Sequence, residues 1–113
     1  MSKLLTQNLP LIQFIATAKP KQAVALLKIL TSDQIKVLAE ISDNTINGRV
    51  DLTPVEKSRL RKYKIFLIHL ASRKKSLKSK KTLLVRGVRA LTLLLETVLP
   101  IVERLALGPA SGP

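Results

Sequence analysis

The sequence predicts an all-α protein: a small helical bundle of four to six short helices with a basic arm and a C-terminal amphipathic helix. Apolar residues make up 46% of the 113 residues, and only 3% are aromatic. Leu, Ile, Val and Ala therefore supply nearly all of the apolar volume, and they recur every three or four positions, as on a helix face. Proline, glycine and capping residues divide the chain into short stretches.

Proline marks the first two expected helices. Asn8 and Pro10 open the first, which Lys19 ends, and Pro20 begins the second. Proline suits these positions because its missing N–H costs nothing in the first helical turn, whereas it breaks a helix interior.

Two capping boxes mark the starts of the next two helices. In a capping box, a Ser or Thr side chain and a Glu or Gln three residues later satisfy the amides that a helix start leaves unpaired. Thr31 with Gln34 has this form, and so does Thr53 with Glu56, which also has Pro54 at the first helical position. Asn47-Gly48 ends the third helix, since both residues tolerate a left-handed backbone. The fourth helix is expected over 54–71.

The fourth helix is half apolar and half basic when its residues are placed at about 100° per residue. Its apolar arc holds Val55, Leu60, Tyr63, Phe66, Leu67, Leu70 and Ala71, and its basic arc holds Lys57, Arg61, Lys62, Lys64 and His69. Ile65 and Ile68 fall within the basic arc, which indicates a partner or packing on two sides.

The sequence after Ala71 predicts three further segments. Residues 72–87 begin with a lysine-rich stretch that has too few apolar residues to bury itself, so we expect a basic arm. Residues 88–107 predict an amphipathic helix that bends at Pro100. We expect residues 1–71 to form the helical domain and residues 108–113 to be a disordered tail.

Positive charge is concentrated in one third of the chain. The net charge is +13, and thirteen Lys and Arg lie between Lys57 and Arg89 with no Asp or Glu among them. Such a segment can neutralise phosphates and release their counterions. We therefore expect largely sequence-independent nucleic-acid binding, with double-stranded DNA favoured and RNA left open. The candidate contact residues are Lys57, Arg61, Lys62, Lys64, Arg73, Lys74, Lys75, Lys78, Lys80, Lys81, Arg86 and Arg89.

The sequence offers little to catalysis or to cofactors. The chain has no cysteine, a single histidine and scattered acids, so no catalytic residues, metal ligands or cofactor are expected. No glycine-rich phosphate loop is present. The prediction is a non-enzymatic protein.

The C-terminal helix supports an alternative function, as a protein-interaction or oligomerisation module. Its apolar arc is wide for a helix that covers one edge of a small core. It either completes the bundle or docks on a second copy, a capsid protein or a membrane surface; the acids on its polar arc weaken the membrane option. The candidate partner-binding residues are Leu91, Leu94, Leu95, Val98, Ile101, Val102 and Leu105.

Several stretches between Leu26 and Val85 resemble one family of short basic proteins. They are Leu26-Leu27-Lys28-Ile29-Leu30, Gln34 to Ile41, Asn44 with Ile46-Asn47-Gly48, Leu52-Thr53-Pro54, Leu60 to Lys64 and Arg73 to Lys81. The family is encoded by the Maverick/Polinton and adintovirus group and is similar to adenoviral protein X. The resemblance implies a virion core or minor structural component that condenses a genome, in a virion or host nucleus. Without a viral origin, an intracellular location is expected.

Overall fold

Eight helices and no strand make up the described part of the chain, residues 2–107 of a computed structural model. The helices are α1 (Lys3–Gln7), α2 (Leu9–Thr17), α3 (Pro20–Leu27), α4 (Ser32–Ile46), α5 (Pro54–Arg61), α6 (Lys64–Ala71), α7 (Leu77–Arg86) and α8 (Val88–Leu107). The all-α prediction is confirmed. The expected disordered tail, 108–113, lies outside the described residues.

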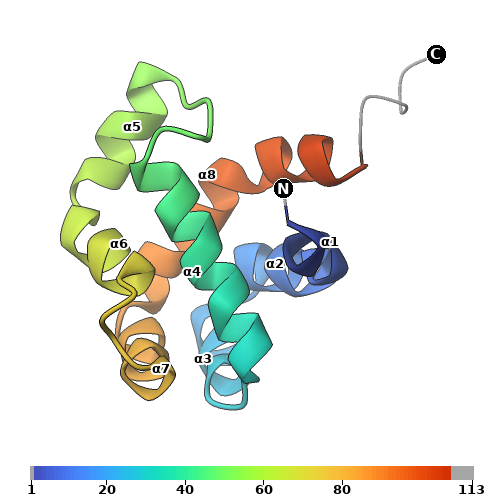
Figure 1. Cartoon of the computed structure of the whole chain (residues 1–113), viewed down its shortest axis with the longest axis vertical. Helices are drawn as coiled ribbons and strands as arrows, with labels where there is room; N and C mark the ends of the chain where they lie inside the picture. Colours follow the sequence, from blue (N-terminus) through green and yellow to red (C-terminus); the bar gives the residue numbers. More distant parts are fainter. Residues whose placement is uncertain (1, 108–113) are drawn as a thin grey trace.

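The helices surround one apolar core. In Figure 1, α4 crosses the front of the molecule, α8 passes behind it, and α5, α6 and α7 stand along one side. The most extensive packing joins α2 to α8 and α4 to α6. A single cluster of buried side chains extends from Leu5 on α1 to Val102 on α8.

The predicted capping boxes are present. The amide of Gln34 donates to the Thr31 hydroxyl at 3.2 Å, and the amide of Thr31 donates to the Gln34 side chain at 2.8 Å. Thr53 and Glu56 make the same reciprocal pair at 3.2 and 2.8 Å. Gly48, after α4, has the expected left-handed backbone, with φ of 71°.

The helix expected over 54–71 is divided in two. It breaks at Lys62 and Tyr63, where the amide of Tyr63 bonds to the carbonyl of Leu60 in a tight last turn. The break changes the direction of the chain, so a single wheel cannot describe both halves. Val55, expected on the buried arc, is 61% exposed. An additional short helix, α1, precedes the first one predicted.

Residues 72–87 do not extend as an arm. Only a short loop is irregular, and α7 packs against α6, α4 and α3. Leu84 is fully buried, and Leu77 and Leu83 pack against the core. The expectation was wrong because the lysine-rich stretch ends within α7, at Lys81. The apolar residues in the second half of α7 then hold the helix against the core.

The C-terminal helix completes the bundle. Because α2, α3, α5 and α7 all pack on α8, its wide apolar arc is covered within the chain. The predicted partner contacts Leu91, Leu94, Leu95, Val98 and Val102 are 0% exposed, so they are not available to a partner or a membrane. Ile101 is half-buried against the same core. Leu105 alone of that set is exposed, at 53%.

Candidate nucleic-acid interface

Most of the thirteen cations between positions 57 and 89 are on the surface. Ten are exposed, Lys75 and Lys81 are half-buried, and Lys80 is buried. We call basic face the eleven unburied cations that lie on α5, the break after it, α6, the 72–76 loop and α7: Lys57, Arg59, Arg61, Lys62, Lys64, Arg73, Lys74, Lys75, Lys78, Lys81 and Arg86.

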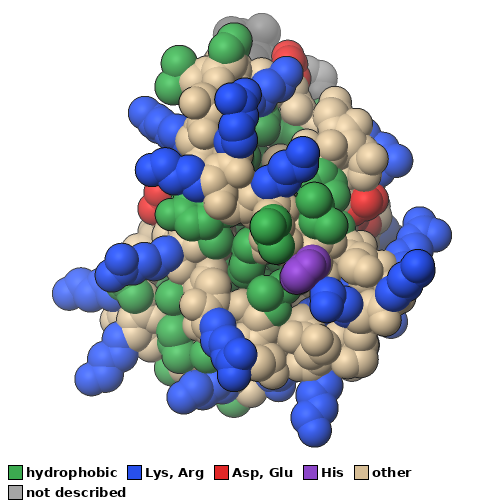
Figure 2. All heavy atoms as spheres, turned by 90° about the vertical axis from the view of Figure 1, so that its left-hand side faces the viewer, with side chains coloured by type: hydrophobic (Ala, Val, Ile, Leu, Met, Phe, Trp, Pro, Cys, Tyr) green, Lys and Arg blue, Asp and Glu red, His purple; other side chains and the backbone are tan. Residues whose placement is uncertain are grey.

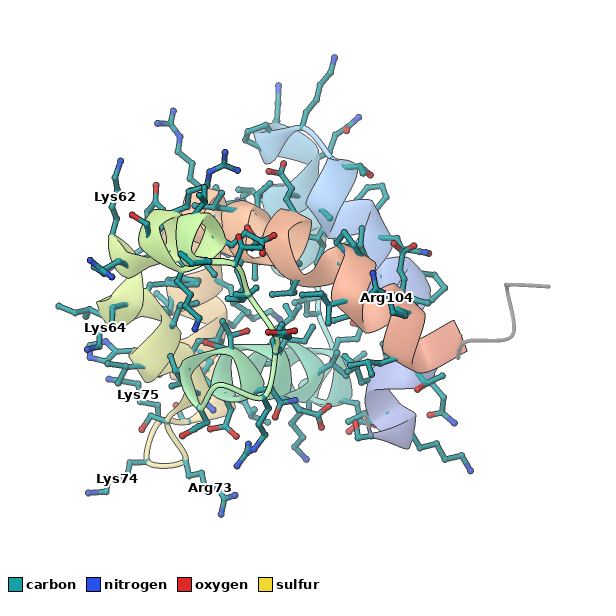
Figure 3. The ribbon with its side chains drawn as sticks, turned by 90° about the horizontal axis from the view of Figure 1, so that it is seen from above. Lys62, Lys64, Arg73, Lys74, Lys75 and Arg104 are labelled. Carbon is teal, nitrogen blue, oxygen red and sulfur yellow. The ribbon has the colours of Figure 1, made fainter. Side chains whose placement is uncertain are left out.

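The basic face occupies the side of the molecule formed by α5, α6 and α7. Lysine and arginine side chains gather over this side in Figure 2, and acids are seen only near its edges. In Figure 3, Lys62, Lys64, Lys75, Lys74 and Arg73 lie around one side and corner of the bundle. Packing thus brings together cations from the α5–α6 break, from α6 and from the 72–76 loop.

The charges of the basic face have no counterion within the described part of the chain. The one ion pair among residues 2–107 joins Arg49 to Asp43 at 3.2 Å, outside this face. Because like charges repel at close range, a row of uncompensated cations is stabilised by an external polyanion.

An apolar strip, formed by Ile65 and Ile68, lies within the basic side of the molecule. Ile65 is 70% exposed and Ile68 is 42% exposed. Helix α6 turns Phe66, Leu67 and Leu70 toward the core, so positions 65 and 68 point outward. In Figure 2 apolar side chains border the chain's single histidine and are surrounded by Lys and Arg side chains. The prediction that both isoleucines fall on the basic arc is consistent with this exposure.

Helix α6 is held on α4 by a buried hydrogen bond. The Ser42 hydroxyl, which is 0% exposed, donates to the carbonyl oxygen of Leu67 at 2.7 Å. A buried hydroxyl with a defined partner fixes the relative position of two helices, because losing the partner leaves a polar group unsatisfied. This contact positions the central helix of the basic face.

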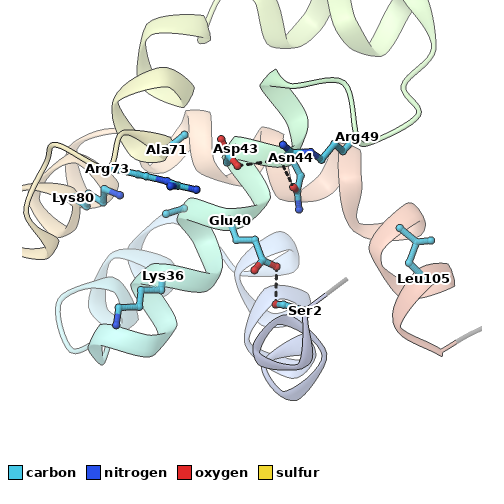
Figure 4. A pocket seen from close by; sticks show the side chains of 11 residues that line it. Ser2, Lys36, Glu40, Asp43, Asn44, Arg49, Ala71, Arg73, Lys80 and Leu105 are labelled. Atoms are coloured by element: carbon cyan, nitrogen blue, oxygen red, sulfur yellow. Dashed lines mark hydrogen bonds and ion pairs between the residues drawn. The ribbon is translucent and has the colours of Figure 1, made fainter.

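A cavity of about 690 Å³ lies against α4, and its lining includes Ala71 at the end of α6 together with Arg73 and Lys80. Figure 4 shows Arg73 and Lys80 reaching toward it from one side, with the carboxylates of Glu40 and Asp43 on α4. Its mixed charge does not suit a polyanion. Arg73 therefore lies at the edge of the basic face.

Lys80 is not on the basic face, which corrects its assignment as a phosphate contact. Its side chain is only 7% exposed, and desolvation by burial lowers the pKa of its ammonium from the ordinary value of 10.5. Lys80 lies three residues after Leu77 and four before Leu84, on the helix stripe that faces the core. This spacing is the signal in the sequence that could have identified Lys80 as a buried residue.

Arg89 is exposed but lies on α8, which is not one of the helices that form the basic face. It lines a small pocket with Glu96 and Pro20. Of the twelve predicted contacts, ten belong to the basic face, and Lys80 and Arg89 do not.

No family model, curated protein or solved structure matches this chain. No helix among the described residues is long and apolar enough to cross a membrane. The same residues contain no group of three His, Cys, Asp or Glu side chains arranged to hold a metal ion.

Proposed function

We propose that this protein binds nucleic acid without catalysing a reaction, by neutralising backbone phosphates with the basic face. One observation carries the proposal: the cations of this face are gathered on one side of the bundle and make no ion pair with a described acid. Contacts with about 6–10 phosphates are enough for strong, salt-dependent binding. The basic face has eleven candidates for such contacts.

The dimensions of the molecule favour a duplex. The longest axis measures 43 Å, and α5, α6 and α7 follow one another along that axis in Figure 1. One turn of B-DNA spans roughly 34–36 Å. A duplex lying along the basic face would therefore span the molecule over about one helical turn.

Recognition of base sequence is not part of the proposal. Seven lysines and four arginines form the basic face, and lysine contacts phosphate as a point charge without reading base edges. The two aromatic residues nearby, Tyr63 and Phe66, pack against the core and do not offer a stacking surface. In the setting that the family resemblance implies, such a protein would condense a viral genome as a core or minor structural component.

A second candidate function is protein association through the apolar strip. Its support is the exposure of Ile65 and Ile68, two large apolar side chains on one helix. A second copy of the chain or a capsid protein would be the partner. Most of the apolar arc of α8 cannot serve this function, because it is buried within the bundle and only Leu105 of the predicted partner contacts is exposed.

A charge-matched pair of variants tests the proposed function. Five exposed lysines of the basic face (Lys57, Lys62, Lys64, Lys74 and Lys78) are changed to Gln in one variant, and five exposed lysines elsewhere (Lys3, Lys19, Lys21, Lys28 and Lys36) are changed in the other. The net charge falls equally in both. We expect the first variant to lose retention of duplex DNA and the second to keep most of it. Equal losses would show that net charge, and not the basic face, causes binding.

A further inference from the structure

A small basic pocket lies between the end of α6 and α7, within the basic side of the molecule. Its volume is about 180 Å³. The lining residues are His69, Lys75, Ser79, Thr82, Leu83 and Arg86. No carboxylate is among them, in contrast to the larger cavity against α4.

Helix periodicity brings these residues together. Ser79, Thr82, Leu83 and Arg86 stand at positions i, i+3, i+4 and i+7 of α7, so they share one side of that helix. His69 comes from the last turn of α6, and Lys75 comes from the loop between the two helices. Helix α6, the 72–76 loop and α7 therefore all contribute hydrogen-bond donors to the lining of this pocket.

Most of these donors have no partner in the described part of the chain. The hydroxyl of Thr82 donates to the carbonyl of Lys78 at 3.3 Å. The side chains of His69, Lys75, Ser79 and Arg86 make no hydrogen bond or ion pair with any residue in the described range. Two cations, an imidazole and a hydroxyl therefore remain free to bind a ligand.

Size and charge restrict what this pocket can bind. Pockets for drug-sized ligands occupy roughly 300–1,000 Å³, and at about 180 Å³ this pocket lies below that range. Cationic and hydroxyl donors without a nearby acid are the chemistry that binds a phosphate group.

We infer that this pocket is a seat for one phosphate group, supplied by the nucleic-acid backbone. The source of the phosphate rests on the proposed function; the ability to bind phosphate does not. Lys75 and Arg86 neutralise the charge, and Ser79 and His69 donate hydrogen bonds to its oxygens. A phosphate held in this way fixes the duplex at one position. The surrounding lysines contact other phosphates of the duplex without fixing its position. His69 and Ser79 are thus binding residues that the charge pattern of the sequence did not reveal.

Titration of the whole chain with inorganic phosphate tests the pocket alone, with amide chemical shifts as the readout. We expect saturable shifts centred on residues 69, 75, 79 and 86. The double substitution Lys75→Gln with Arg86→Gln should abolish them, and the charge-matched Lys57→Gln with Arg61→Gln should not. Ser79→Ala, which changes no charge, should weaken binding about tenfold, and Ser58→Ala on α5 should have no effect. Shifts spread evenly over the basic face would overturn the inference.

Duplex DNA tests the source of the phosphate. At one salt concentration, the Lys75/Arg86 variant should lose about tenfold more duplex affinity than the Lys57/Arg61 variant. Equal losses would show that no backbone phosphate occupies the pocket. If the Lys75/Arg86 variant loses binding to phosphatidylglycerol vesicles but keeps the duplex affinity of the unmodified protein, the pocket binds lipid instead. If the unmodified protein binds phosphate at the pocket but no duplex, the proposed function fails and the phosphate site remains.

Discussion

The ring of Phe66 on α6 packs directly against the backbone of Gly87, at the end of α7. A Cβ atom at position 87 would approach two ring carbons more closely than 3.0 Å. The φ of Gly87 is −100°, a value open to any residue. Glycine is therefore required here for space and not for backbone conformation. The contact joins two of the three helices that form the basic face.

Substituting Gly87 by Ala should destabilise the fold through overpacking. The added methyl group must displace a ring that its neighbours enclose, since Phe66 is only 9% exposed. We expect a loss of about 1–3 kcal/mol in the free energy of unfolding, measured by urea denaturation. In a Phe66→Leu background the same substitution should cost clearly less, because the ring is gone. Equal costs in the two backgrounds would contradict the contact.

Removing the Ser42 hydroxyl should loosen the attachment of α6 to α4. Ser42→Ala is expected to lower the free energy of unfolding by about 0.5–1.5 kcal/mol. Thr45→Ala is the matched control: its hydroxyl donates to Ile41 within the same helix, at 2.7 Å, and joins no second element. We expect amide exchange in α6 to accelerate in the Ser42 variant and to stay unchanged in the control. Unchanged exchange in both variants would mean that the hydrogen bond does not hold α6.

Replacing Lys80 by Met should stabilise the protein at neutral pH. Burial lowers the pKa of the Lys80 ammonium below 10.5, so the charged form is disfavoured in the folded state. Between the lowered pKa and 10.5, Lys80 is protonated more often in the unfolded chain than in the folded protein. The free energy of unfolding therefore rises with pH in that window.

The gain from Lys80→Met should thus be largest at neutral pH and should shrink as the pH approaches 10.5. Thermal unfolding from about pH 7 up to that value measures it. The control is Lys78→Met at an exposed position of the same helix. A gain independent of pH would mean that improved packing, and not the buried charge, explains the effect.

Substitutions on α8 distinguish a core helix from a partner surface. Leu94 is 0% exposed and Leu105 is 53% exposed. Leu94→Ala should therefore cost about 2–5 kcal/mol in the free energy of unfolding, whereas Leu105→Ala should change it by about 0.5 kcal/mol or less. Comparable small effects at both positions would show that α8 is not part of the core.

Local signals in the sequence predicted much of the secondary structure. A capping box such as Thr31 with Gln34 satisfies backbone groups within one helical turn, so its consequence does not depend on the rest of the chain. The break at Tyr63 and the burial of Lys80 depend on how α6 and α7 meet α4. Such tertiary packing overrides the periodicity of a single stretch.

The charge of the candidate site was predictable from the sequence, but its shape was not. The acid-free run of Lys and Arg is sufficient to identify ten cations of the basic face. The pocket of His69 and Ser79 joins positions from two helices, and no motif links them in sequence. Their proximity follows from the packing of α7 against α6.

The salt dependence of duplex binding tests the central claim most directly: uncompensated cations of the basic face neutralise backbone phosphates. The association constant for a mixed-sequence duplex is measured by fluorescence anisotropy between about 50 and 200 mM salt. With about 6–10 phosphate contacts, log K should fall against log salt with a slope of roughly −5 to −9. A slope near zero, or binding that persists unchanged across this range, would contradict the claim.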